Sequence, residues 1–328
     1  MAPLLFGLEE EVFITEPDRP TMQSLYYLAR LLWRDPAYYY THTACNFTRG
    51  KDLRFGLMSG IEISTGTFAA IPALLADLQR RRRELAAVCP GLIVPVGHLF
   101  DREEPTNICG LHIHVSGFLD RERAYRNLVY FLPLLALLVI NSPVAGNRYY
   151  GQSYRLAEAF AIGSLREDRL YRFQDLIESK RLGTLEMRVF DPVWDLERIR
   201  VLLECIRAIL AADVDYPGDI KVYNRLRYRV AREGYTWELR PVYNDLRRLL
   251  PVPEALFRHT PAEALGELWL REGTLATYTA LDNAYRNGIL KPRPLPPLRV
   301  RWPLMLAGFC GYYIPRVPYN IKKVWLEW

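Results

Sequence analysis

The chain has 328 residues, half of them hydrophobic and 24% charged, which is enough apolar material for a sizeable core and excludes wholesale disorder. The formal net charge of +6 comes almost entirely from scattered arginines, which argues against nucleic-acid binding and suits anionic small molecules. Five widely spaced cysteines form no CxxC or zinc-finger pattern, so we expect reduced, mostly buried thiols in a cytoplasmic protein.

We expect neither a signal peptide nor a membrane span. The N-terminus lacks a basic region followed by an apolar core. The most apolar run, Leu128 to Ile140, is 13 residues long and contains Pro133. It is short for a bilayer span and predicts a buried helix.

Hydrophobic periodicity predicts strands alternating with helices. In chain order we expect a strand over 4–14, a helix over 22–33, an extended segment over 53–65, a helix over 70–89, strands over 92–97 and 108–118, a helix over 121–140 capped by Asp120, an irregular active-site loop region over 144–180, a strand over 184–191, and helices from Asp195 to 213, over 238–250 and over 261–286. This order predicts an α/β or α+β sheet with helices packed on one side.

The run Glu9-Glu10-Glu11 interrupts the first expected strand. Side chains two residues apart in a strand share a face, so Glu9 and Glu11 would point the same way. An exposed edge strand that carries protective charges is one explanation. The apolar residues on both sides of the run favour a buried strand instead, where carboxylates need a compensating cation or hydrogen bonds.

Three more expected strands carry polar side chains at alternating positions. Glu62 lies between Ile61 and Ile63 and, taken alone, reads as a solvent-facing residue. His112 and His114 could ligate a transition metal, complete an oxygen-rich magnesium site or be structural. A cupin-type metal site fits poorly, because the nearest following glutamate, Glu122, lies beyond the strand end.

Glu186 and Arg188 share a face of the last expected strand. They could form a structural ion pair, or they could place a metal next to a phosphate. Acidic groups on several neighbouring strands would line a surface that binds divalent metal, often together with nucleotide phosphates. The run Arg80 to Arg83, in contrast, reads as the solvated face of a helix.

The order of motifs resembles the second glutamate–cysteine ligase family, a carboxylate–amine ligase group related in fold to glutamine synthetase. The matching segments are FGLEEE, GIEIST, VPVGHLF, CGLHIHVSG, INSPVAG…SYR and LGTLEMRVFD, which cover about residues 5–213. The resemblance implies an α+β fold, mainly an antiparallel sheet that forms a funnel-like active site with helices packed on its outer side. We expect this glutamine-synthetase-like catalytic domain over 1–287, and a Pro-rich, aromatic tail over 288–328 that packs on the domain or on a partner subunit.

The resemblance also implies roles for single residues. It implies five metal ligands: Glu9, Glu11, Glu62, His112 and Glu186. It places Arg188 and His114 on ATP, and Arg155, Ser153 and His114 on the glutamate substrate, where Arg155 would clamp a carboxylate. Arg188, Arg155 and His112 would take part directly in catalysis. In one departure, Phe55 stands where the wider group often carries an acidic residue, with Asp52 nearby.

The implied reaction uses ATP and Mg²⁺, with Mn²⁺ as a possible substitute. ATP would phosphorylate the γ-carboxylate of glutamate, and an amine, cysteine or another amino acid, would then displace the phosphate. With cysteine as the acceptor, the reaction would belong to glutathione biosynthesis. The protein could form homo-oligomers.

Three alternatives stay open at this point. A guanidino-type phosphotransferase also uses a carboxylate-rich sheet, but it keeps the phosphate on its product. Phe55 suggests an inactive member that binds an amino acid or a nucleotide. The two histidines suggest a transition-metal enzyme.

Overall fold

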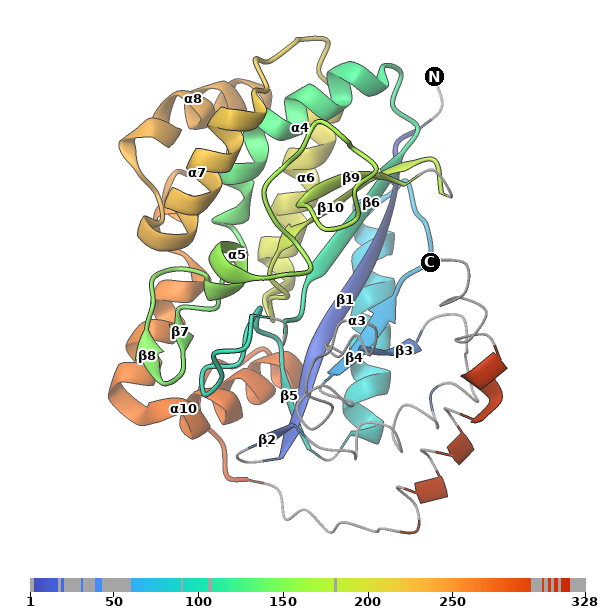
Figure 1. Cartoon of the computed structure of the whole chain (residues 1–328), viewed down its shortest axis with the longest axis vertical. Helices are drawn as coiled ribbons and strands as arrows, with labels where there is room; N and C mark the ends of the chain where they lie inside the picture. The colour runs from blue at the N-terminus through green and yellow to red at the C-terminus, as the bar shows by residue number, and fades with distance from the viewer. Residues whose placement is uncertain are drawn as a thin grey trace.

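The computed structural model describes residues 3–16, 19–20, 31, 39–42, 60–89, 91–105, 108–179, 182–295, 303, 306–307, 310–311 and 314–318. Within them, an antiparallel sheet of eight strands carries helices on one face (Figure 1). The strands are β1 (Leu5–Glu16), β2 (Arg19–Pro20), β3 (Tyr39–His42), β4 (Gly60–Ser64), β5 (Leu92–Val94), β6 (Leu111–Ser116), β9 (Leu176–Ser179) and β10 (Thr184–Phe190). The expected α+β class with an antiparallel sheet is confirmed.

The strand β1 organises the sheet. The main strand order is β3-β4-β1-β6-β10-β9, and β2 and β5 pair with the C-terminal part of β1. The register places Glu9 opposite His112 on β6 and Glu11 opposite Glu62 on β4. Glu9 and Glu11 thus each have a polar residue of a distant motif as their neighbour in the sheet.

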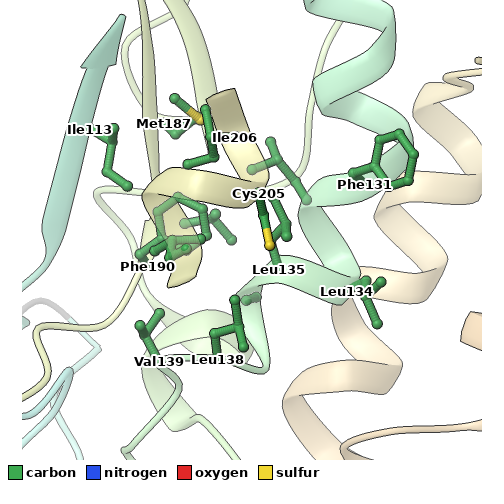
Figure 2. Packing of buried hydrophobic residues seen from close by; sticks show 14 of the residues in the cluster. Ile113, Phe131, Leu134, Leu135, Leu138, Val139, Met187, Phe190, Cys205 and Ile206 are labelled. Carbon is green, nitrogen blue, oxygen red and sulfur yellow. The ribbon is translucent and has the colours of Figure 1, made fainter. Parts of the chain in front are cut away.

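The core lies between the sheet and three helices, α3 (Ile71–Val88), α4 (Arg121–Ala136) and α6 (Leu196–Ala211). Figure 2 shows Ile113, Met187 and Phe190 from the sheet packed against side chains of α4 and α6. The apolar run from Leu128 to Ile140 is buried here as predicted, apart from the partly buried Tyr130, but its helix ends at Ala136.

Side chains cap two of these helices at their N-termini. Asp120 accepts a hydrogen bond from Arg123 N of α4, and Asp195 accepts one from Glu197 N of α6. Both helix starts were expected from the sequence.

The chain forms further helices outside this central layer. They are α5 (Tyr154–Glu158), α7 (Ile220–Glu233), η2 (Trp237–Leu239), α8 (Arg240–Leu249), α9 (Ala255–Arg258), α10 (Pro261–Asn287) and η3 (Ile314–Arg316), and a small ribbon pairs β7 (Val144–Ala145) with β8 (Arg148–Tyr149). The kink in α10 falls at Gly273, whose φ of 80° suits glycine. The helix α7 was not predicted, because arginine and tyrosine dilute its apolar stripe, although Tyr223 and Arg227 themselves are buried.

One prediction about charge is wrong. The run Arg80 to Arg83 is not a uniformly solvated face, because Arg81 and Arg82 are buried. Arg82 forms an ion pair with Glu10 and donates to the carbonyls of Val193 and Trp194. The buried carboxylate of Glu10 draws this guanidinium into the core, since a buried charge needs a partner of opposite sign.

The described thiols are free, with Cys89, Cys109 and Cys205 buried and Cys310 intermediate. No described helix combines the length and apolar character needed to cross a bilayer. The expected helix over 22–33, the segment 53–59 with Phe55, and most of the tail lie wholly or largely outside the described residues, and the division into a domain and a tail stays a prediction.

Candidate functional site

The face of the sheet opposite α3, α4 and α6 carries the polar side chains that the sequence singled out. Alternation sends Ile61, Ile63, Leu111, Ile113 and Met187 into the core. The side chains between them point the other way, from four neighbouring strands: Glu9 and Glu11 on β1, Glu62 on β4, His112 and His114 on β6, and Glu186 and Arg188 on β10. We call these residues the acidic wall.

Three residues of the acidic wall could hold a metal ion together. Glu9, His114 and Glu186 each offer one ligand atom, and these atoms all lie within 4.8 Å of one another. The Glu9 carboxylate oxygen Oε2 lies 3.4 Å from His114 Nε2 and 3.4 Å from His112 Nδ1. His112 Nδ1 lies 4.0 Å from Glu186 Oε1. Side chains from three strands therefore converge on one point.

The donors fit a divalent cation. Both ring nitrogens of His114 are shielded from solvent: Nε2 faces Glu9 Oε2 at 3.4 Å, and Nδ1 meets no hydrogen-bond partner among the described residues. Two carboxylates and one imidazole make a mostly oxygen-donating set, compatible with Mg²⁺ or Mn²⁺. Glu9, His114 and Glu186 would hold the ion.

Electrostatics within the cluster favour the ionised form of Glu9. Burial opposes ionisation of Glu9, but hydrogen bonds and charge interactions with His112 and His114 lower the pKa of Glu9 well below its ordinary value. Burial disfavours the His114 imidazolium, yet Glu9 and Glu186 raise the pKa of His114. The negative charge of the carboxylates therefore stabilises a positive charge at His114, and it would stabilise a bound cation in the same way.

Glu11 and Glu62 lie on the same face but outside this group of three. They are directly opposite each other on β1 and β4. Glu11 is 7% exposed, and its Oε2 accepts a hydrogen bond of 2.7 Å from Gly110 N. Two carboxylates in cross-strand register favour a cation nearby. Their role as metal ligands stays a prediction.

Arg188 lies at the edge of the metal-binding group. Its Nε is 3.3 Å from Glu186 Oε1, and its Nη1 donates to the carbonyl of Arg172 in the segment before β9. These two contacts hold the guanidinium beside a metal ligand, where it can meet an anion that the metal also binds.

Ser153 and Arg155 are placed differently, in a buried polar cluster around Asp191 at the end of β10. Ser153 Oγ donates to Asp191 Oδ2 at 3.0 Å and caps α5 at Leu156 N. Arg155 is 1% exposed, and its guanidinium binds Asp191 and the carbonyls of Arg188 and Val189. The substrate contacts expected of both residues stay a prediction.

Asp191 was not predicted as a site residue. It also accepts hydrogen bonds from Asn141 N and Ser142 Oγ, and a Cβ on Gly97 would lie 2.4 Å from its Oδ1. The sequence offers one signal for Asp191, which is its position directly after the buried strand β10, because a buried carboxylate needs several hydrogen-bond donors.

This buried cluster abuts the acidic wall at Gly110. A Cβ there would lie 2.3 Å from Arg155 Nη2 and 3.0 Å from His112 Nε2. The glycine therefore lets the buried arginine and the histidine of the wall approach the same backbone atom.

No protein-family model and no curated protein matches the sequence. Among solved structures, the chain is similar to the glutamate–cysteine ligase from Francisella tularensis in complex with AMP, with a TM-score of 0.60 and 11% identity over 95% of this chain and 92% of that one. The chain has the fold of glutamate–cysteine ligase. The resemblance expected from the motif order is confirmed at this level.

A second similar structure belongs to a longer protein. The bifunctional glutathione synthetase from Pasteurella multocida gives a TM-score of 0.59 and 13% identity over 87% of this chain and 52% of that one. The chain therefore spans about half the length of the Pasteurella protein. At 11–13% identity, the two structures show a shared fold alone.

Proposed function

We propose that the chain is an ATP-dependent carboxylate–amine ligase. The observation that carries the proposal is the convergence of Glu9, His114 and Glu186 from three strands, with Arg188 beside Glu186. When bound there, a divalent cation such as Mg²⁺ neutralises charge on the phosphates of ATP. The names of the two similar structures, a glutamate–cysteine ligase and a glutathione synthetase, support the reaction class.

The side chains of this chain orient the phosphates. Arg188, held by Glu186 and by the Arg172 carbonyl, would form charge-assisted hydrogen bonds with the phosphoryl group that is transferred. His112 lies against Glu9 and fixes the position of that carboxylate. Few of these groups need to rearrange during the reaction, which is how such sites stabilise developing charge.

The reaction needs no covalent nucleophile from the protein. A carboxylate oxygen of the substrate attacks the γ-phosphorus of ATP, giving an acyl phosphate and ADP. The amine nitrogen then attacks the acyl carbon, the carbon–oxygen bond breaks, and inorganic phosphate leaves with an amide as product. The enzyme contributes mainly by holding the two substrates in line.

The substrates we propose are glutamate, activated at its γ-carboxylate, and cysteine or another amino acid as the amine. The name of the Francisella ligase supports this pair. Magnesium is the proposed ion and manganese the substitute. Ser153 and Arg155 are bonded to Asp191, so they could contact glutamate only after leaving that carboxylate. We therefore propose that glutamate first binds to residues of the acidic wall.

Phosphate release tests this function. We expect wild-type protein with Mg²⁺, ATP and glutamate to release free phosphate when the correct amine from a panel of amino acids and amines is added. Glu186→Gln should lower this turnover by about a hundredfold or more, since it removes one metal ligand. Glu204→Gln, on the outer part of α6 beside Arg200, is the matched control and should keep full turnover.

Other outcomes point to the alternatives. Formation of ADP with phosphate retained on an organic product would identify a phosphotransferase. Binding of ATP and Mg²⁺ without consumption over the whole panel would identify a binding protein. Either result contradicts the ligase proposal.

A transition-metal enzyme is the second candidate, because His112 and His114 both lie 3.4 Å from the same oxygen of Glu9. Metal analysis of purified protein separates the two. One equivalent of tightly held zinc or iron that survives dialysis would favour this candidate over the ligase.

A further inference from the structure

The segment between α5 and β9 carries a group of aromatic rings that the proposed chemistry does not use. It consists of Phe160, Tyr171 and Phe173 together with Arg166, and we call it the aromatic loop. In Figure 1 this segment crosses in front of β9 and β10, while α4 and α6 lie behind them. The aromatic loop is therefore on the side of the sheet that carries the acidic wall.

The rings of the aromatic loop are contiguous. The ring of Phe173 lies 5.9 Å from that of Phe160 and 5.6 Å from that of Tyr171, measured between centroids. The Arg166 guanidinium lies 4.0 Å from the Tyr171 centroid. Phe160 is 49% exposed, and Tyr171 and Phe173 are partly exposed. The loop thus offers ring surface and a stacked cation to a ligand.

The loop is tied down at its base. Leu165 exchanges hydrogen bonds of 2.7 and 3.0 Å with the side chain of Asn224 on α7. Buried Asp175 accepts a bond from Tyr223 and pairs with Arg227, both also on α7. Because these anchors fix the loop before any ligand arrives, binding on its rings would cost little ordering entropy.

A direct chain of contacts joins the loop to the proposed metal site. Arg172 stands between Tyr171 and Phe173, and its carbonyl accepts from Arg188 Nη1. Arg188 Nε lies 3.3 Å from the metal ligand Glu186. A ligand whose phosphates are held by Arg188 and by a cation on Glu186 would therefore have the aromatic loop beside it.

We infer that the aromatic loop stacks the purine base of the nucleotide whose phosphates are held at Arg188 and the acidic wall, an inference that rests on the proposed function. Bases stack on aromatic rings and on arginine planes. The aromatic side chain of an acceptor amine has a similar π face. The base is favoured because Arg188 lies between the metal ligand and the rings, where the anionic linker of a nucleotide would pass.

Calorimetric titration with two probes tests the inference. The probes are ATP with Mg²⁺ and tripolyphosphate with Mg²⁺, which keeps the phosphates and lacks the base. Phe160→Leu and Phe173→Leu keep apolar volume and remove one ring each. We expect each to weaken ATP binding by about tenfold, within the range for loss of one stacking ring, and to leave tripolyphosphate binding unchanged.

The controls separate stacking from damage to the fold. Trp237→Leu removes an aromatic ring that is 77% exposed on η2 and should leave both affinities unchanged. Phe160 is half exposed, so its variant should unfold at the wild-type temperature even if Phe173→Leu does not. An equal loss of affinity for both probes in Phe160→Leu, or unchanged ATP affinity in both loop variants, overturns the inference.

A third probe and the turnover assay resolve the remaining outcomes. If the loop variants keep ATP affinity and lose affinity for phenylethylamine, the rings bind an acceptor and the base assignment is wrong. If ATP affinity depends on the rings but ATP is never consumed, the ligase proposal fails and this inference stands. If amide is formed but ATP affinity is the same with and without the rings, the ligase proposal stands and this inference fails.

Discussion

Three adjacent glutamates in β1 have three different environments. Glu9 faces His112 and His114 on the acidic wall, and Glu11 accepts from Gly110 N. Glu10 points to the opposite face, where Arg82 and the hydroxyl of Tyr285 bind it. Strand alternation alone separates a group expected to bind metal from one that stabilises the core.

Neutralising Glu10 and Glu9 should therefore have opposite effects. Glu10→Gln leaves Arg82 buried without its counter-charge, and we expect a loss of about 3 kcal/mol in the free energy of unfolding with Mn²⁺ affinity retained. Glu9→Gln removes the charge that pairs with His112 and His114, and we expect a folded protein that has lost Mn²⁺ binding. Urea unfolding and calorimetry measure both quantities. Loss of Mn²⁺ binding in a folded Glu10→Gln variant would contradict the assignment of faces.

His98 predicts a pH dependence of stability. Burial lowers the pKa of His98 from 6.5 to about 4, although the Glu104 carbonyl bonded to its Nε2 raises it in part. Between these pH values the unfolded chain binds a proton at His98 that the folded chain does not. The contribution of His98 to the free energy of unfolding is therefore fully present above pH 6.5 and is lost as the pH drops from 6.5 towards 4. The loss amounts to at most ~3 kcal/mol.

A substitution isolates this effect from the titration of carboxylates. We expect the urea midpoint of wild-type protein to fall more steeply between pH 7 and pH 5 than that of His98→Gln. Parallel pH profiles for the two proteins would show that His98 does not set the dependence.

At the scale of elements, Arg155 contacts the irregularity in β10. The pairing of β10 with β6 shifts between Met187 and Phe190, and the Arg155 guanidinium binds the carbonyls of Arg188 and Val189 that lie in this bulge. Asp191 holds the guanidinium in turn. Bulges redirect side chains, and this one lies directly after Glu186 and at Arg188.

Arg155→Lys tests whether this residue positions the site or clamps a substrate. A lysine cannot reproduce the fork that binds several acceptors, so Arg188 should be misplaced. A positioning role predicts that kcat falls by about tenfold or more with a nearly unchanged KM for glutamate. A clamp on the glutamate carboxylate predicts mainly a rise in that KM. The two outcomes separate the structural contacts from the role that the motif implies.

The sequence predicts single helices and strands better than it predicts which distant residues contact each other. Periodicity located α3, α4 and α6, and capping aspartates marked two helix starts, because these signals are local. It could not show that Glu10 pairs with Arg82, 72 positions away, or that Asp191 collects four separate donors. Such partners are set by strand order and by packing between distant segments. The same limit made Arg82 look like a surface residue.

For the whole molecule, ligand binding should be visible as stability. A ligand that binds only the folded state at a concentration of 100 Kd contributes about 2.7 kcal/mol. We therefore expect ATP with Mg²⁺ to raise the Tm by a few degrees, and EDTA to remove the increase. Glu186→Gln should show no increase, whereas Glu204→Gln should show the full one. A Tm increase with ATP and EDTA together would exclude a metal-dependent site.

The pairing of β1 with both neighbours has a consequence for folding accuracy. A strand displaced by one position would bring Glu9 and Glu11 to the single guanidinium of Arg82 and leave Glu10 alone opposite the histidines, while Phe6, Leu8 and Val12 would turn to water. Two carboxylates at one guanidinium and the exposure of three apolar side chains to water both disfavour that misalignment. A chain with this misaligned strand would be inactive and prone to aggregate. The three consecutive glutamates therefore help to select the native strand register.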